Sequence, residues 1–104
     1  MWIFLNDAFL SIVARRDDPD ALLVRARCQG DIERAFPGAA VSETPAADYR
    51  YRAILPRQTV AAALAATVAG IDYPNFKASV ADPDRHDAYL DCWGILRDWQ
   101  QSAS

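Results

Sequence analysis

Two short segments in which apolar and charged residues alternate constrain the fold of this chain more than any other feature. Residues 22–27 read LLVRAR and residues 49–55 read YRYRAIL. Because successive side chains of an extended strand point to opposite faces, each segment predicts a strand with one apolar face and one arginine-bearing face. If both strands belong to one sheet, four guanidinium groups share its open face: Arg25, Arg27, Arg50 and Arg52.

The apolar side chains of the same two segments are expected to face the core. In the first segment this set is Leu22, Val24 and Ala26, and in the second it is Tyr49, Tyr51, Ala53 and Leu55. A sheet with one apolar face needs a covering layer, and helices elsewhere in the chain can provide it. The alternation therefore predicts a two-layer fold.

Turn residues and helical spacing predict the remaining elements. Asn6 and Asp7 tolerate tight hairpin turns, so they predict a hairpin between two β-prone runs. Pro83 suits the first turn of a helix that Asp82 begins. The predicted strands are 2–5, 8–14, 21–28, 41–44 and 49–55, and the predicted helices are 30–36, 56–69 and 82–100. We expect one α+β domain over residues 1–104: an antiparallel sheet of four to five strands, with two long helices and one short helix on one face.

The last predicted helix has a clear apolar stripe. Its large apolar residues recur at steps of three and four, as on one face of a helix: Tyr89, Cys92, Trp93, Leu96 and Trp99. We expect this stripe to lie in the core, with Trp99 in a dimer contact as the alternative. The acidic residues Asp84, Asp87 and Asp91 are either solvated or face the arginines of another subunit.

Charge and composition exclude several classes of protein. The formal net charge is −3, which argues against general affinity for nucleic acid. The apolar start of the chain is interrupted too early for a secretory signal, and no apolar run is long enough to span a membrane. We expect a cytoplasmic protein that does not bind membranes. The chain has ten Arg and one Lys, and twelve Asp and two Glu, a bias that a GC-rich coding sequence also explains.

The arginine row allows several interpretations. Guanidinium groups bind carboxylates or phosphates with two hydrogen bonds, so the row could recognise an acidic partner. Alternatively, it is a solvated strand face whose arginines pair with nearby aspartates. A homodimer through this face would need acidic groups to offset the repelling charges.

A second candidate site lies between residues 71 and 86. Its polar and aromatic members are Tyr73, Lys77, Arg85 and His86. His86 is the only histidine, the usual residue for acid–base chemistry, and an ion pair with Asp82 four residues earlier would suit it. The alternatives are that Tyr73 and Phe76 only anchor the segment and that His86 is an ordinary surface residue.

No catalytic or cofactor motif is present in the sequence. The two cysteines and one histidine lack metal-ligand spacing, and there is no glycine-rich phosphate loop or nucleophile elbow. We therefore assign no catalytic residue, no metal site and no cofactor.

Several segments together resemble a family of small bacterial proteins of uncharacterised function. They are residues 2–5, 9–13, 48–52, 71–77 and 85–93, so the resemblance extends over nearly the whole chain. It implies a single-domain bacterial protein of the cytoplasm and carries no activity, ligand or partner.

The leading functional hypothesis is a non-enzymatic module that binds a protein partner or a second copy through the arginine-lined sheet face. The alternative is a small enzyme or ligand-binding protein with a pocket near residues 71–86. Weak nucleic-acid binding by the arginines is a third interpretation, against which the net charge argues.

Overall fold

The computed structural model describes residues 1–103 of the chain. Two compact units divide it, the first comprising residues 1–72 and the second beginning at Tyr73. The first unit contains the whole sheet and two helices, and the second contains the last helix. Each unit is described below by itself.

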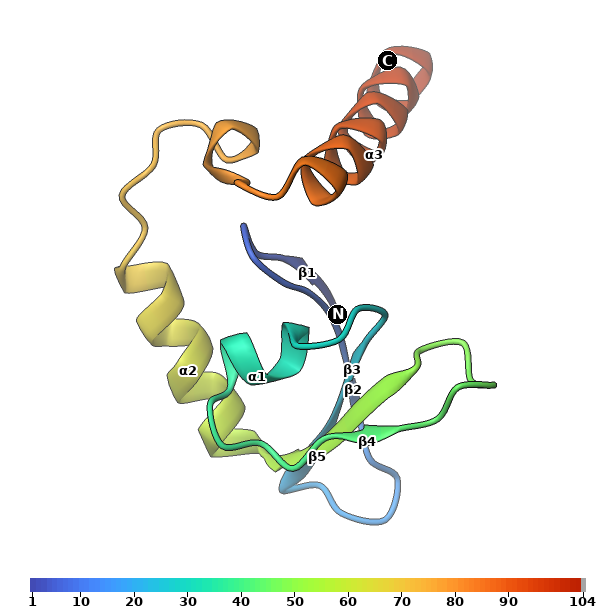
Figure 1. Cartoon of the computed structure of the whole chain (residues 1–104), viewed down its shortest axis with the longest axis vertical. Helices are drawn as coiled ribbons and strands as arrows, with labels where there is room; N and C mark the ends of the chain where they lie inside the picture. The colour runs from blue at the N-terminus through green and yellow to red at the C-terminus, as the bar shows by residue number, and fades with distance from the viewer. Residues whose placement is uncertain (104) are drawn as a thin grey trace. The chain divides into compact units, whose positions relative to one another are not determined.

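A five-stranded antiparallel sheet forms the centre of the first unit (Figure 1). Its strands are β1 (Trp2–Phe4), β2 (Phe9–Ala14), β3 (Ala21–Ala26), β4 (Ser42–Glu43) and β5 (Tyr51–Pro56). Their order across the sheet is β1-β2-β3-β5-β4. The first three strands form an antiparallel meander that includes the predicted hairpin, and the two alternating segments lie side by side as β3 and β5.

Register places the apolar residues of neighbouring strands beside one another. Ile12 lies opposite Val24, which lies opposite Ala53 on its other side. All three side chains are buried in the core. Because side chains alternate along each strand, this register puts every second residue of the three central strands on the covered face.

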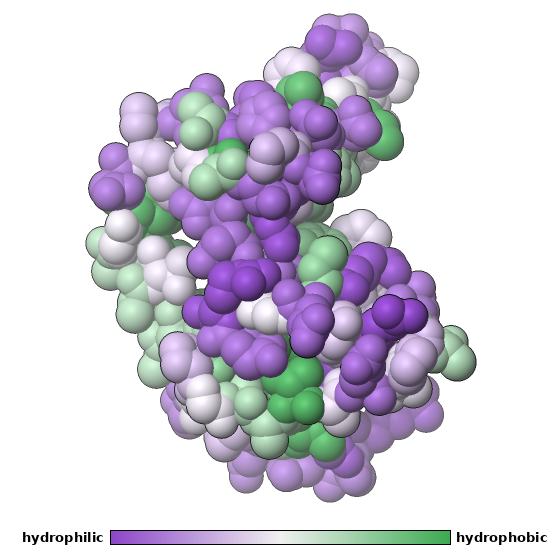
Figure 2. Space-filling model, in the orientation of Figure 1, coloured by the Kyte–Doolittle hydropathy of each residue, from purple (hydrophilic) through white to green (hydrophobic). Residues whose placement is uncertain are grey.

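Two helices, α1 (Asp31–Ala35) and α2 (Arg57–Ala69), cover that face. Ile32 and Phe36 from the region of α1 and Val60 from α2 complete the core cluster. Gly30 adopts a left-handed conformation with φ 89° immediately before α1, a backbone angle that glycine tolerates best. The exposed side of α2 is mostly apolar, as Figure 2 shows, because nine of its thirteen residues are alanine, valine or leucine.

The second unit contains a short 3₁₀ helix, η1 (Lys77–Ser79), and the long helix α3 (Pro83–Ala103). The Asp82 carboxylate accepts a hydrogen bond of 2.8 Å from the Arg85 amide, so Asp82 caps α3 as predicted. The ring of Phe76 stacks on that of Tyr89, with 5.8 Å between their centroids. These contacts join the segment before α3 to the first turns of the helix.

The predicted α+β class with an antiparallel sheet is confirmed, and the sheet has five strands. The single domain over residues 1–104 stays a prediction. The predicted burial of the α3 stripe is wrong for its later residues, since Trp93, Leu96 and Trp99 are exposed and only Tyr89 is buried. No helix within residues 1–103 is long and apolar enough to cross a membrane.

Candidate functional site

The sheet face opposite α1 and α2 has a row of polar residues that runs across the strands. We call this surface the open face and define it by Trp2, Ser11, Val13, Leu23, Arg25, Arg27, Arg52 and Ile54. In the central row, Trp2 lies opposite Ser11, Ser11 opposite Arg25, and Arg25 opposite Arg52. The next row contains Val13, Leu23 and Ile54. The open face therefore has arginines beside apolar side chains.

Arg25 is held in place from two sides. Its Nη2 donates a hydrogen bond of 2.7 Å to the hydroxyl of the buried Ser11. Its guanidinium carbon lies 4.6 Å from the centroid of the Tyr49 ring. Its buried Nε has no hydrogen-bond partner within residues 1–103. Arg25 is thus positioned without a carboxylate.

Arg27 shares the same aromatic ring. Its guanidinium carbon lies 4.2 Å from the Tyr49 centroid, and its Nη1 donates to the backbone oxygen and the carboxylate of Asp48, each at 3.1 Å. The hydrogen bond to Asp48 raises the pKa of Arg27, so this guanidinium stays charged at any physiological pH. Half of the Arg27 side chain and most of the Asp48 side chain are exposed, so the pair is well solvated.

Arg52 completes the row on β5. Its Nε donates to the backbone oxygen of Tyr49 at 3.3 Å, and it lies directly opposite Arg25. Like charges opposite each other destabilise a sheet. Neither Arg25 nor Arg52 forms an ion pair with any other residue from 1 to 103. The predicted pairing of the row with aspartates therefore applies to Arg27 alone.

The predicted orientation of Tyr49, just before β5, is wrong. The chain bends at residues 49 and 50, and the strand begins at Tyr51, so strand alternation does not extend to them. Tyr49 therefore lies beside Arg25 and Arg27 instead of facing the helices. Arg50 is exposed and precedes the strand, so its place in the arginine row stays a prediction.

Exposed apolar side chains border the arginines. Trp2 on β1 is 68% exposed and Ile54 on β5 is 56% exposed. The Trp2 ring contacts that of Phe9 edge to face, with 6.2 Å between centroids. Tryptophan and arginine are the residues that most often dominate binding energy at protein interfaces. The open face combines both types on one rigid sheet.

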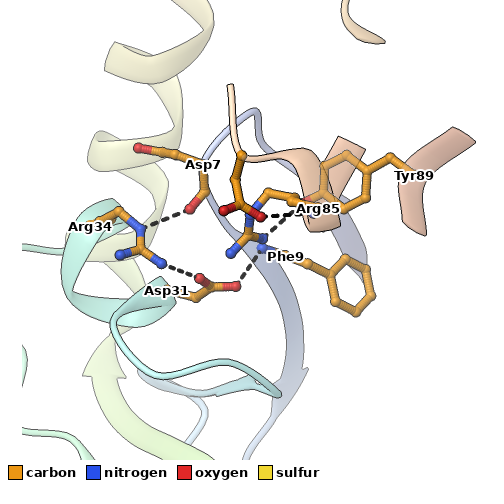
Figure 3. Close-up of polar contacts among 7 residues, drawn as sticks. Asp7, Phe9, Asp31, Arg34, Arg85 and Tyr89 are labelled. Carbon is orange, nitrogen blue, oxygen red and sulfur yellow. Dashed lines mark hydrogen bonds and ion pairs between the residues drawn. The ribbon is translucent and has the colours of Figure 1, made fainter. Parts of the chain in front are cut away.

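The four residues of the second predicted site all lie in the second unit, where aromatic contacts hold most of them. The rings of Tyr73 and Phe76 are 5.9 Å apart, and Lys77 Nζ lies 4.7 Å from the Trp93 centroid. Arg85 donates to the Tyr89 hydroxyl at 3.1 Å (Figure 3). These contacts favour the anchoring interpretation of Tyr73 and Phe76.

His86 has no arrangement typical of acid–base catalysis. Its Nδ1 lies 3.5 Å from the carboxylate of the adjacent Asp87. The predicted ion pair with Asp82 is wrong, because the Asp82 carboxylate caps the helix at the Arg85 amide instead. The Asp82 carboxylate bonds to the helix instead of to His86 because the first amides of a helix have no acceptor within the helix.

An ion pair between a buried aspartate and an exposed arginine in the first unit was not predicted from the sequence. Asp31, only 1% exposed, accepts a hydrogen bond of 3.0 Å from the Phe9 amide and pairs with Arg34 three residues later (Figure 3). Arg34 Nε also donates to the Asp7 backbone oxygen at 2.8 Å. The i, i+3 spacing on α1 was the only available signal. This pair joins α1 to the β1–β2 hairpin and has a structural role.

The comparisons with known proteins leave the site to be interpreted from its geometry. No model of a protein family matches the chain, and neither curated proteins nor solved structures give a match. Within residues 1–103, no group of three His, Cys, Asp or Glu side chains could hold a metal ion.

Proposed function

We propose that this protein is a non-enzymatic interaction module that binds an acidic protein surface through its open face. The observation that carries the proposal is the pair of arginines on β3 and β5. Arg25 and Arg52 lie directly opposite each other, and neither has a carboxylate partner within residues 1–103. An incoming carboxylate would relieve their repulsion and gain charge-assisted hydrogen bonds.

The arginine side chains of the open face are also held in place without a partner. Ser11 and Tyr49 fix Arg25, Tyr49 and Asp48 fix Arg27, and β5 positions Arg52. Side chains that are already ordered lose less conformational entropy on binding, which favours affinity. The sheet thus presents guanidinium groups in a defined pattern.

The neighbouring apolar residues favour a protein over other anionic ligands. Trp2 and Ile54 would remain in water beside a nucleic-acid backbone, whereas a protein surface could cover them. The net charge of −3 also opposes general attraction to nucleic acid. The expected partner surface has aspartate or glutamate next to apolar residues, and the expected location of the interaction is the cytoplasm.

A pull-down with charge-reversed variants tests the proposal. Arg27→Glu combined with Arg52→Glu should reduce the captured partner at least tenfold relative to the wild type. Arg16→Glu combined with Arg57→Glu is the matched control, because it changes the net charge equally at the β2–β3 turn and the start of α2. Equal loss in both double variants would show a net-charge effect and contradict a specific site.

The alternative hypothesis of an enzyme or ligand-binding site near residues 71–86 makes the opposite prediction. His86→Ala should then remove binding or activity while the arginine variants keep it. In the part of the chain that the structure describes, the one side-chain ion pair of His86 is with Asp87, and it gives this alternative no support. The arginine-lined face therefore remains the better candidate.

A further inference from the structure

The second half of α3 carries a surface that its own unit does not bury. Ile95, Leu96 and Trp99 are 68%, 57% and 67% exposed. The aromatic contacts of the second unit involve the earlier residues Tyr89 and Trp93 instead. Soluble proteins rarely leave so much contiguous apolar surface without an interaction partner.

Acidic residues border this apolar surface on one side. Asp91, Ile95 and Asp98 follow one another at steps of four and three, so they lie along one edge of the helix. Trp99 lies four residues after Ile95 and continues the same side. Among residues 1–103, Asp98 forms an ion pair only with the neighbouring Arg97, at 3.3 Å. Both side chains are exposed, so this ion pair contributes little to stability. This edge of α3 is therefore both acidic and apolar.

The edge is complementary to the open face in charge and in spacing. Asp91 and Asp98 are separated by about 10 Å along the helix axis, at 1.5 Å per residue. Arg27 lies two residues after Arg25, just past the end of β3, so its Cα atom is at most about 7 Å along the chain from that of Arg25, which lies opposite Arg52. The length of an arginine side chain covers the difference. Trp2 and Ile54 on the sheet would meet Ile95 and Trp99 on the helix.

We propose that α3 of a second copy of this chain binds the open face, which makes the protein a homodimer. This proposal rests on the proposed function and names its partner. Because each copy carries both complementary surfaces, two copies related by a twofold axis can form the same contact twice, which closes the assembly. The acidic edge also argues against a membrane surface as the ligand of α3, since membrane-binding helices carry Lys and Arg there.

A charge-swap experiment on full-length chains tests the dimer. One variant carries Arg27→Glu and Arg52→Glu, and the other carries Asp91→Arg and Asp98→Arg. Each variant alone juxtaposes like charges and should have the mass of one 11.5 kDa chain by light scattering. An equimolar mixture restores opposite charges at both contacts, so it should regain the mass of two chains, as in the wild type. The variant with Arg16→Glu and Arg57→Glu should remain dimeric.

A second variant tests the dimer even if the charge-reversed chains do not fold. Ile95→Ser combined with Trp99→Ser changes only exposed side chains, so it should keep the wild-type circular dichroism spectrum. It should still raise the dimer dissociation constant at least tenfold. A folded variant that dimerises as tightly as the wild type overturns the proposal.

Different experimental results would contradict the homodimer and the proposed function. A monomeric wild type, or a charge-swap mixture that stays monomeric, overturns the dimer. If the monomeric wild type nevertheless captures a different acidic protein and the Arg27 and Arg52 variant does not, the proposed function stands with another partner. If the arginine variant changes neither the mass nor the capture of any protein, both proposals are wrong.

Discussion

The first unit contains two polar clusters that differ in what faces the guanidinium groups of their arginines. Around α1, Arg34 bonds to the buried carboxylate of Asp31 and to the Asp7 backbone oxygen. On the open face, Arg25 and Arg52 are held by a hydroxyl, an aromatic ring and a backbone oxygen, with no acidic partner. The first arrangement satisfies its charge internally, and the second does not.

Under the proposed function, this difference separates an arginine that stabilises the fold from one that is available for binding. The Asp31 carboxylate is buried, and weakening the hydrogen bonds of a buried charged group is costly. Removing Arg52 from the open face takes no partner from a buried carboxylate and relieves its repulsion with Arg25. Four substitutions test this distinction, and they follow in order of decreasing expected effect.

Asp31→Asn should have the largest effect on stability. It removes the charge that faces Arg34 and weakens the acceptor for the Phe9 amide. We expect the free energy of unfolding to fall by about 2–4 kcal/mol, measured by urea denaturation. Glu33→Gln on the exposed side of α1 is the control and should change it by less than about 0.5 kcal/mol. Equal effects of the two would remove the distinction between the clusters.

Tyr49→Leu should have an intermediate effect. The buried Tyr49 ring contacts both Arg25 and Arg27, and each cation–π contact contributes about 0.5–1 kcal/mol. We expect a loss of about 1–2 kcal/mol in the free energy of unfolding. Tyr49→Phe retains the ring and should keep most of the stability. A large loss with Phe would mean that the hydroxyl, and not the ring, organises the arginines.

Arg52→Gln should leave folding almost unchanged. The substitution removes one of two like charges at opposite positions on β3 and β5. We expect the free energy of unfolding to stay within about 0.5 kcal/mol of the wild type, or to rise slightly. The same denaturation measurement on Arg34→Gln should show a clear loss. A strongly destabilised Arg52→Gln protein would make the open face a structural cluster like the first.

The smallest effect concerns an ion pair at the surface between Arg15 and the exposed Asp17, which serves as a reference for both clusters. Arg15 donates two hydrogen bonds to Asp17 and holds the pKa of that carboxyl below its ordinary value of 3.8. The lowered pKa means that this pair stabilises the fold above pH 3.8 and that its contribution disappears as the pH falls through the folded-state pKa. Carboxyl-carbon NMR titration should show the Asp17 pKa rising in Arg15→Gln, and an unchanged value would contradict the pairing.

Local patterns were sufficient to predict most elements of this fold. Alternation identified β3 and β5 and the apolar set Leu22, Val24 and Ala26, because the period of a strand is fixed by its backbone. Helix-start residues predicted α3 at Asp82 and Pro83, because capping depends on neighbouring residues. The chain's own periodicity also placed Arg25 and Arg52 on one face.

Tertiary structure decided where those patterns end and what their faces meet. The bend at residues 49 and 50 moved Tyr49 to the arginines, and folding brought Asp31 to the Phe9 amide from 22 residues away. The α3 stripe was correctly identified as a helix face, but its later residues are exposed. Periodicity states which side chains share a face. The surface that covers that face depends on contacts between distant segments or between chains, and these leave no local pattern in the sequence.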